Sequence, residues 1–155
     1  MALSKADAET IKKELSHIFG EVLLNCDGYA VYARLEKSKM KLVIAVNVNG
    51  GYRAIDFFQD KESLLDTMTD ISRRFYNIKS VGHSAKKTKL IISIYGKIRA
   101  KKEGILERRC WTIPHFATAN SFISHIKKHN QSIEIITREV YEAMIEALPK
   151  EVANG

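Results

Sequence analysis

Nine basic side chains lie within residues 86–109, a density that suits the neutralisation of a polyanion. They are Lys86, Lys87, Lys89, Lys97, Arg99, Lys101, Lys102, Arg108 and Arg109. With Glu103 and Glu107 as its acids, the segment carries a net charge of +7, equal to that of the whole chain, which has 25 basic and 18 acidic residues. The excess charge is therefore confined to one segment. Such a cluster predicts a polyanionic partner, either DNA or RNA or an acidic protein surface.

Two aromatic residues, Tyr95 and Trp111, are interleaved with these cations. Cations neutralise phosphates and flat rings stack on bases, so the combination is typical of single-stranded nucleic acid binding. Alternatively, the aromatics belong to a core or an interface, and the lysines keep an edge strand from aggregating. Lys127 and Lys128 add a second basic pair on a predicted helix. The candidate binding residues are Lys86, Lys87, Lys89, Tyr95, Lys97, Arg99, Lys101, Lys102, Arg108, Arg109, Trp111, Lys127 and Lys128.

The basic segment is predicted to be a β-hairpin, because its apolar residues alternate with polar ones. Leu90, Ile92, Ile94 and Ile98 share one parity, which favours a half-buried strand over residues 88–98. Residues 100–104 (AKKEG) read as a polar turn, and residues 105–113 as a return strand that ends before Pro114. The facing of the return strand stays open. Its inward residues are either Leu106, Cys110 and Thr112 or Ile105, Trp111 and Ile113.

Motifs for other chemistries are incomplete in this sequence. Residues 82–88 (GHSAKKT) lack the glycine that a phosphate-binding loop requires before its lysine. His125 and His129 have a metal-binding spacing, but Lys127 and Lys128 lie between them and would repel a divalent cation. Cys110 follows Arg109 but has no identifiable histidine partner, and the acids are dispersed. The sequence therefore predicts no catalytic residue, metal site or cofactor, and an enzyme is the residual alternative.

Length and composition bound the class of protein. A chain of 155 residues fits a single domain over residues 1–155, with a frayed tail at 150–155. Its two cysteines, Cys26 and Cys110, are expected to be reduced thiols. No signal-peptide pattern is evident, and no apolar run approaches the roughly 20 residues that a membrane helix needs. We therefore expect a cytoplasmic protein that does not contact a membrane.

Around the basic segment, local signals predict alternating helices and strands. An amphipathic helix is expected over residues 5–19, and a three-stranded antiparallel meander over residues 29–36, 42–49 and 52–58. Residues 22–25 either extend the helix or form a fourth strand. Asp27-Gly28 and Asn49-Gly50-Gly51 are turn signals between these strands. A second helix is expected to begin at its cap Asp60 and to run to residue 75, followed by a loop over 77–85 with room for a short strand. A third helix is expected after Pro114, to about residue 129, and the apolar residues 132–136 allow a further strand. A last helix follows its cap Thr137, with a buried face formed by Val140, Tyr141, Met144, Ile145 and Leu148.

The resulting order is α-β-β-β-α-β-β-α-(β)-α. It predicts an α+β fold in which an antiparallel sheet of about five to six strands packs with about four helices. The expected function is non-enzymatic binding of nucleic acid or a nucleoprotein through the basic hairpin. The alternative is a protein–protein adaptor or inhibitor that docks the hairpin on an acidic or nucleic-acid-binding surface of a larger machine. An exposed edge strand also allows a homodimer.

Overall fold

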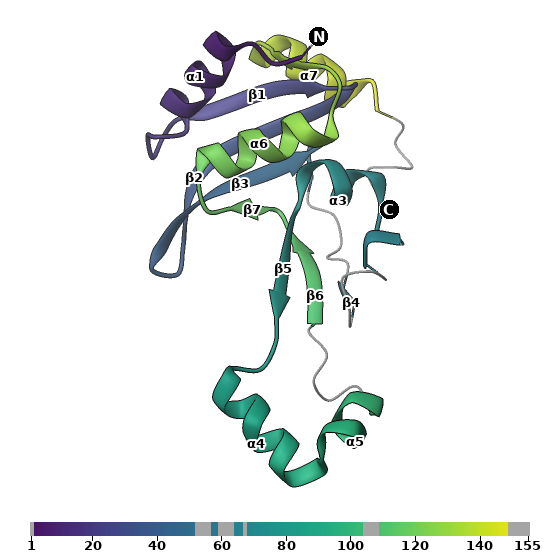
Figure 1. The fold of residues 1–155 in the computed structure, drawn as a ribbon. Helices are drawn as coiled ribbons and strands as arrows, with labels where there is room; N and C mark the ends of the chain where they lie inside the picture. Colours follow the sequence, from purple (N-terminus) through teal and green to yellow (C-terminus); the bar gives the residue numbers. More distant parts are fainter. Residues whose placement is uncertain (1, 52–56, 59–63, 67, 104–108, 149–155) are drawn as a thin grey trace. The chain divides into compact units, whose positions relative to one another are not determined.

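The computed structural model describes residues 2–51, 57–58, 64–66, 68–103 and 109–148 (Figure 1). Its contacts divide the chain into two compact units. The larger unit is formed by the described parts of residues 1–54, 70–77 and 114–155, and the smaller unit by those of 55–69 and 78–113. The α+β class is confirmed. The single-domain organisation over 1–155 stays a prediction, and the tail 150–155 lies outside the described residues.

A five-stranded antiparallel sheet with the order β7-β3-β2-β1-β8 organises the larger unit (Figure 1). The meander β1 (Glu21–Cys26), β2 (Tyr29–Ser38) and β3 (Lys41–Val48) forms its centre. The edges are β7 (His115–Phe116) and β8 (Ile133–Ile135), so the predicted strand at 132–136 is confirmed.

The turn between β1 and β2 and the turn that follows β3 have the left-handed backbone that their residue types favour. Asp27 has φ 49° and Gly28 has φ 93°, while Asn49 has φ 55° and Gly50 has φ 81°. Asp, Asn and Gly tolerate positive φ, so Asp27-Gly28 connects β1 to β2 as predicted, and Asn49-Gly50 turns the chain after β3.

Helices cover both faces of this sheet. Alternate residues of β1, β2 and β3, including Leu24, Val31 and Val46, are completely buried on one face. They form one core cluster with residues of α1 (Lys5–Glu14), α3 (Asp70–Phe75) and α6 (Ala119–His129). On the other face α7 (Arg138–Glu146) packs near β1 and β2, and the ring centroids of Tyr141 and Tyr32 lie 6.4 Å apart.

Several predicted boundaries need correction. α1 ends at Glu14, five residues earlier than predicted, and Ile18 and Phe19 are exposed in the following loop. Thr137 caps α7 as predicted, but none of its apolar residues is fully buried. The helix predicted between residues 60 and 75 is observed at residues 64–66 and, after a break at residues 68 and 69, as α3; its predicted cap Asp60 lies outside the described residues.

Arg74 in α3 contacts two segments of the larger unit that are far apart from it in the sequence, Asp27 and Asn130, to whose Oδ1 its Nη1 donates at 3.2 Å. Its Nη1 lies 2.7 Å from Asp27 Oδ2 in the β1–β2 turn, and its Nε lies 2.9 Å from Asp70 Oδ2. Backbone N–H groups of Gln131 and Ser132 donate to the Asp27 carboxylate at 2.9 and 2.8 Å. The hydrogen bond from the Gln131 N–H lowers the pKa of Asp27 most strongly, and those from Ser132 and Arg74 lower it further.

The smaller unit contains the sheet β4-β6-β5. Its strands are β4 (Phe57–Phe58), β5 (Asn77–Val81) and β6 (Arg109–Ile113). The predicted return of 52–58 onto the meander is therefore wrong for residues 57–58, which pair with β6; residues 52–56 lie outside the described part. In β6, Cys110 and Thr112 are buried, as in the first of the two predicted facings.

The basic segment is a pair of helices, so the predicted hairpin is wrong. Between β5 and β6 in the chain lie α4 (Ala85–Tyr95) and α5 (Lys97–Lys102), where a strand and a turn were expected (Figure 1). Ser84 caps α4, because its Oγ accepts the N–H of Lys87 at 3.2 Å. Gly96, with φ 81°, ends α4 and begins α5. Its left-handed backbone turns the chain without a steric cost.

Candidate nucleic-acid interface

The candidate interface is the basic helix pair, which we define as residues 84–103. It contains seven basic side chains and one acid, Glu103, a net charge of +6. All seven cations are exposed: Lys86, Lys87, Lys89, Lys97, Arg99, Lys101 and Lys102. Within the described residues, Arg99 alone among them forms an ion pair, with its Nε 3.2 Å from Glu103 Oε1. The remaining six charges are available to an external anion.

Apolar side chains accompany the cations on the same helices. α4 contains Leu90, Ile91, Ile92, Ile94 and Tyr95 but buries none of its residues. Leu90 is 58 % exposed and Ile94 64 % exposed, and Ile98 in α5 reaches 85 %. Within the described residues of the basic helix pair, only Ala100 is buried. The pair therefore presents apolar as well as cationic surface to solvent.

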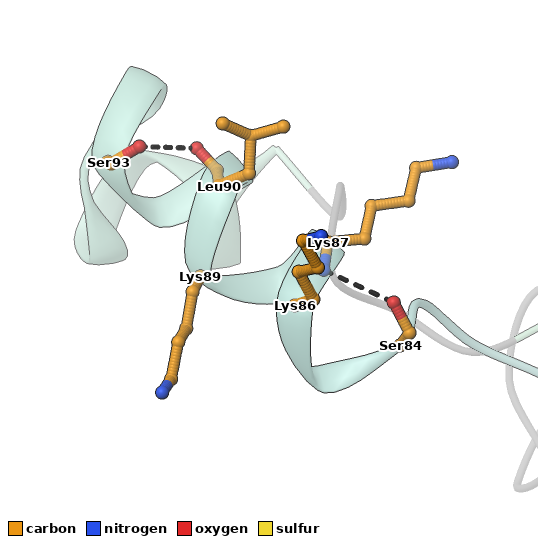
Figure 2. Close-up of a pocket in the computed structure, with 6 residues that line it drawn as sticks. All are labelled: Ser84, Lys86, Lys87, Lys89, Leu90 and Ser93. Atoms are coloured by element: carbon orange, nitrogen blue, oxygen red, sulfur yellow. Dashed lines mark hydrogen bonds between the residues drawn. The ribbon is translucent and has the colours of Figure 1, made fainter.

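Figure 2 shows the depression at the start of α4, which has a volume of about 630 Å³ and is lined by Ser84, Lys86, Lys87, Lys89, Leu90 and Ser93. Lys87 and Lys89 extend to opposite sides of the helix (Figure 2). Two residues apart on a helix, they are separated by about 200° around its axis. The ammonium groups therefore do not converge on one point. This arrangement suits an extended anion with many charges better than a single bound phosphate.

The other predicted site residues lie elsewhere in the fold. Arg109 is exposed at the start of β6, while Trp111, on the same strand, is half-buried. Lys127 and Lys128 are exposed in the last turn of α6, which belongs to the larger unit. Arg108 lies outside the described residues. The structure thus places eight of the thirteen candidates in the basic helix pair, counting Tyr95.

The rings of His125 and His129 on α6 lie side by side, with centroids 4.4 Å apart and planes tilted by 42°. His125 Nε2 lies 3.1 Å from the carbonyl oxygen of Arg73, which can only accept, so this nitrogen donates. Burial, with a further contribution from His129, lowers the pKa of His125 to about 4. Within the described part of the chain, no three His, Cys, Asp or Glu side chains are grouped as a metal site would require.

We predict that His125 makes the protein less stable in mild acid. Because its pKa is depressed in the folded state, the unfolded chain binds the extra proton first. The contribution of His125 is complete above about pH 6.5 and is lost as the pH falls towards about 4. After allowance for solvent screening, the loss should be about 1–2 kcal/mol. Urea unfolding of His125→Gln should show a flatter pH dependence in this window than wild type. The control His17→Gln, at an exposed position after α1, should follow wild type; identical profiles for all three proteins would contradict the prediction.

Both thiols are buried. Burial raises the pKa of Cys26 to about 12, and Cys110 lies in the small core cluster with Leu64 and Met68. A buried thiol with a raised pKa is a poor nucleophile, so Cys26 has a packing role. No helix among the described residues has the length and apolarity needed to cross a membrane.

Sequence reasoning missed three contributors to this surface. Leu90, Ile94 and Ile98 were assigned to a buried strand face, but they are exposed. Nothing in the local sequence indicates that they are exposed, because leucine and isoleucine are equally typical of a buried core. The pairing of Arg99 with Glu103 was also missed, although their four-residue spacing is typical of ion pairs on a helix. Comparison of the chain with protein-family models, with curated proteins and with solved structures gives no match.

Proposed function

We propose that the protein binds nucleic acid through the basic helix pair, without catalysing a reaction on it. The observation that carries this proposal is the set of seven exposed cations on α4 and α5, accompanied by the single acid Glu103. Lysine and arginine neutralise phosphates and release the counterions condensed on the polymer. Contacts of this kind supply affinity and position but little sequence preference.

The salt dependence of binding tests this proposal. With about five phosphates neutralised, affinity for a labelled oligonucleotide should fall on the order of 10²- to 10³-fold between 50 and 200 mM salt. Fluorescence anisotropy with single-stranded and duplex DNA and RNA measures this slope directly. Absence of binding to every oligonucleotide at 50 mM salt would contradict the proposal.

A second candidate is an acidic protein surface as the partner, as in an adaptor or inhibitor. The exposed aliphatic side chains Leu90, Ile94 and Ile98 favour it, because phosphates make no use of apolar groups. A protein of this kind would bind poly-glutamate or an acidic domain and would ignore free oligonucleotides. The same anisotropy titration with labelled poly-glutamate therefore distinguishes the two candidates.

A further inference from the structure

We propose that the basic helix pair takes single-stranded nucleic acid, and that Tyr95, Ile98 and Arg99 form a subsite for one unstacked base. This inference rests on the proposed function and names the form of polymer that the surface fits. The subsite lies at the junction of α4 and α5, where Gly96 connects the two helices (Figure 1).

A depression of about 790 Å³ marks this junction. Tyr95 and Ile98 supply apolar surface to it, Lys97, Arg99 and Lys102 supply positive charge, and Gly96 and Glu103 complete the lining. Apolar and cationic groups therefore share one concave surface within nine residues of chain, 95–103. A nucleotide needs both, since its base is flat and apolar on its faces while its phosphate is anionic.

Two flat groups in the depression, the Tyr95 ring and the Arg99 guanidinium, contact each other. The guanidinium carbon of Arg99 lies 5.9 Å from the centroid of the Tyr95 ring, in a cation–π contact. Arg99 is also held by Glu103, to whose Oε1 its Nε donates at 3.2 Å. Bases stack on tyrosine rings and on guanidinium planes alike, so the pair offers a prearranged platform.

The exposed apolar side chains of the basic helix pair favour a single strand over a duplex as the ligand. Ile98 is 85 % exposed and Tyr95 44 % exposed, and contact with phosphates would leave both in water. The faces of paired bases are stacked on their neighbours and offer nothing to such side chains. The faces of unpaired bases are accessible, and stacking would remove the exposed apolar groups from water.

The distribution of charge agrees with a flexible strand. Lys87 and Lys89 extend to opposite sides of α4 (Figure 2), so a flat or rigid partner on one side would leave cations of the other side unused. A single strand bends and can contact both. A second copy of the same surface is disfavoured, because two patches of +6 repel each other.

The test compares three labelled probes of equal length: a single-stranded dT oligomer, the duplex of the same length, and an abasic oligomer that has phosphates but no bases. Wild type is expected to bind the dT oligomer about 10-fold or more tightly than the abasic one at equal salt. The variant Tyr95→Ala/Ile98→Ala should weaken binding of the dT oligomer about 10- to 100-fold and change binding of the abasic oligomer less than about 2-fold.

Phe19→Ala/Ile18→Ala is the matched control. It also removes one aromatic and one isoleucine side chain, 98 % and 67 % exposed, but from the larger unit, and should bind like wild type. Circular dichroism should show equal helix content in all proteins.

Three results would overturn the inference while leaving the proposed function in place. They are equal affinity of wild type for the three probes, an unchanged affinity of the Tyr95/Ile98 variant for the dT oligomer, and an equal loss for the dT and abasic oligomers. Equally tight binding of poly-glutamate would overturn the choice of nucleic acid as the ligand. Failure of every nucleic acid probe at 50 mM salt would instead overturn the proposed function itself.

Discussion

Lys86→Glu/Lys87→Glu is expected to weaken nucleic acid binding on the order of 100-fold at 100 mM salt. The double variant removes two phosphate contacts and places two anions in the depression at the start of α4. Losing two contacts should also reduce the slope of log affinity against log salt by about 2. The first turn of α4 contains no acid, and glutamate there interacts favourably with the helix dipole. Loss of binding would therefore not reflect loss of the helix.

Lys37→Glu/Lys41→Glu is the matched control for that variant. It makes the same change in net charge at two exposed positions on β2 and β3, in the larger unit. Its affinity is expected to stay within about 3-fold of wild type, because neither lysine belongs to the basic helix pair and salt screens the effect of net charge alone. An equal loss in both variants would mean that overall charge, and not the basic helix pair, determines binding.

The second large effect concerns stability. Arg74→Met is expected to lower the free energy of unfolding by about 2–3 kcal/mol, as measured by urea denaturation followed by circular dichroism. Methionine keeps the aliphatic contacts, but the carboxylates of Asp27 and Asp70 lose their shared cation. The Arg74 and Asp27 side chains are only 26 % and 20 % exposed, so water replaces the lost contacts poorly.

Arg34→Met provides the comparison. Arg34 and Glu36 are 3.7 Å apart with side chains 50 % and 38 % exposed, and such a surface pair contributes little. We expect a change below about 0.5 kcal/mol. Similar losses for the two variants would contradict the assignment of Arg74 as the residue that joins the β1–β2 turn to α3.

The central strands β2 and β3 of the larger unit could be predicted because their signals are local, whereas β7 lies in a segment that was predicted to be helical. Asp27-Gly28 and Asn49-Gly50 require positive φ, and the apolar alternation between these turns has the period of a strand. Thr137 caps α7, with its Oγ1 accepting the N–H of Val140, and this cap could also be predicted from the sequence. The Arg74–Asp27 contact could not be predicted, because the two residues are 47 positions apart and neither local sequence indicates that they meet.

The basic segment was predicted wrongly because its apolar residues fit two periods at once. Leu90, Ile92 and Ile94 alternate as in a strand, but Ile91 and Tyr95 have the other parity, so the apolar residues do not keep to one face of a strand. Such runs are ambiguous between a strand and a helix. The residues at the two ends of the run resolve this ambiguity in favour of a helix. Ser84 Oγ accepts the N–H of Lys87, and Gly96, eleven residues after Ala85, has φ 81°. Greater weight on these caps would have identified α4.

The residues of the candidate site could be predicted from the sequence, but their arrangement in space could not. The identity of the cations follows from the sequence, and seven of them are exposed on α4 and α5. Their distribution on opposite sides of a helix, and the exposure of Ile98, depend on a helical conformation that the hairpin prediction excluded.

The most direct test of the central claim is a titration of isotopically labelled protein with a short oligonucleotide, followed by the chemical shifts of its backbone amides. Binding through the basic helix pair predicts that the largest shift changes fall within residues 84–103, including Lys87, Tyr95 and Arg99. Residues of the larger unit, such as those around Lys127 on α6, should change little. Changes concentrated in the larger unit, or no changes at low salt, would contradict the assignment of the basic helix pair as the nucleic acid interface.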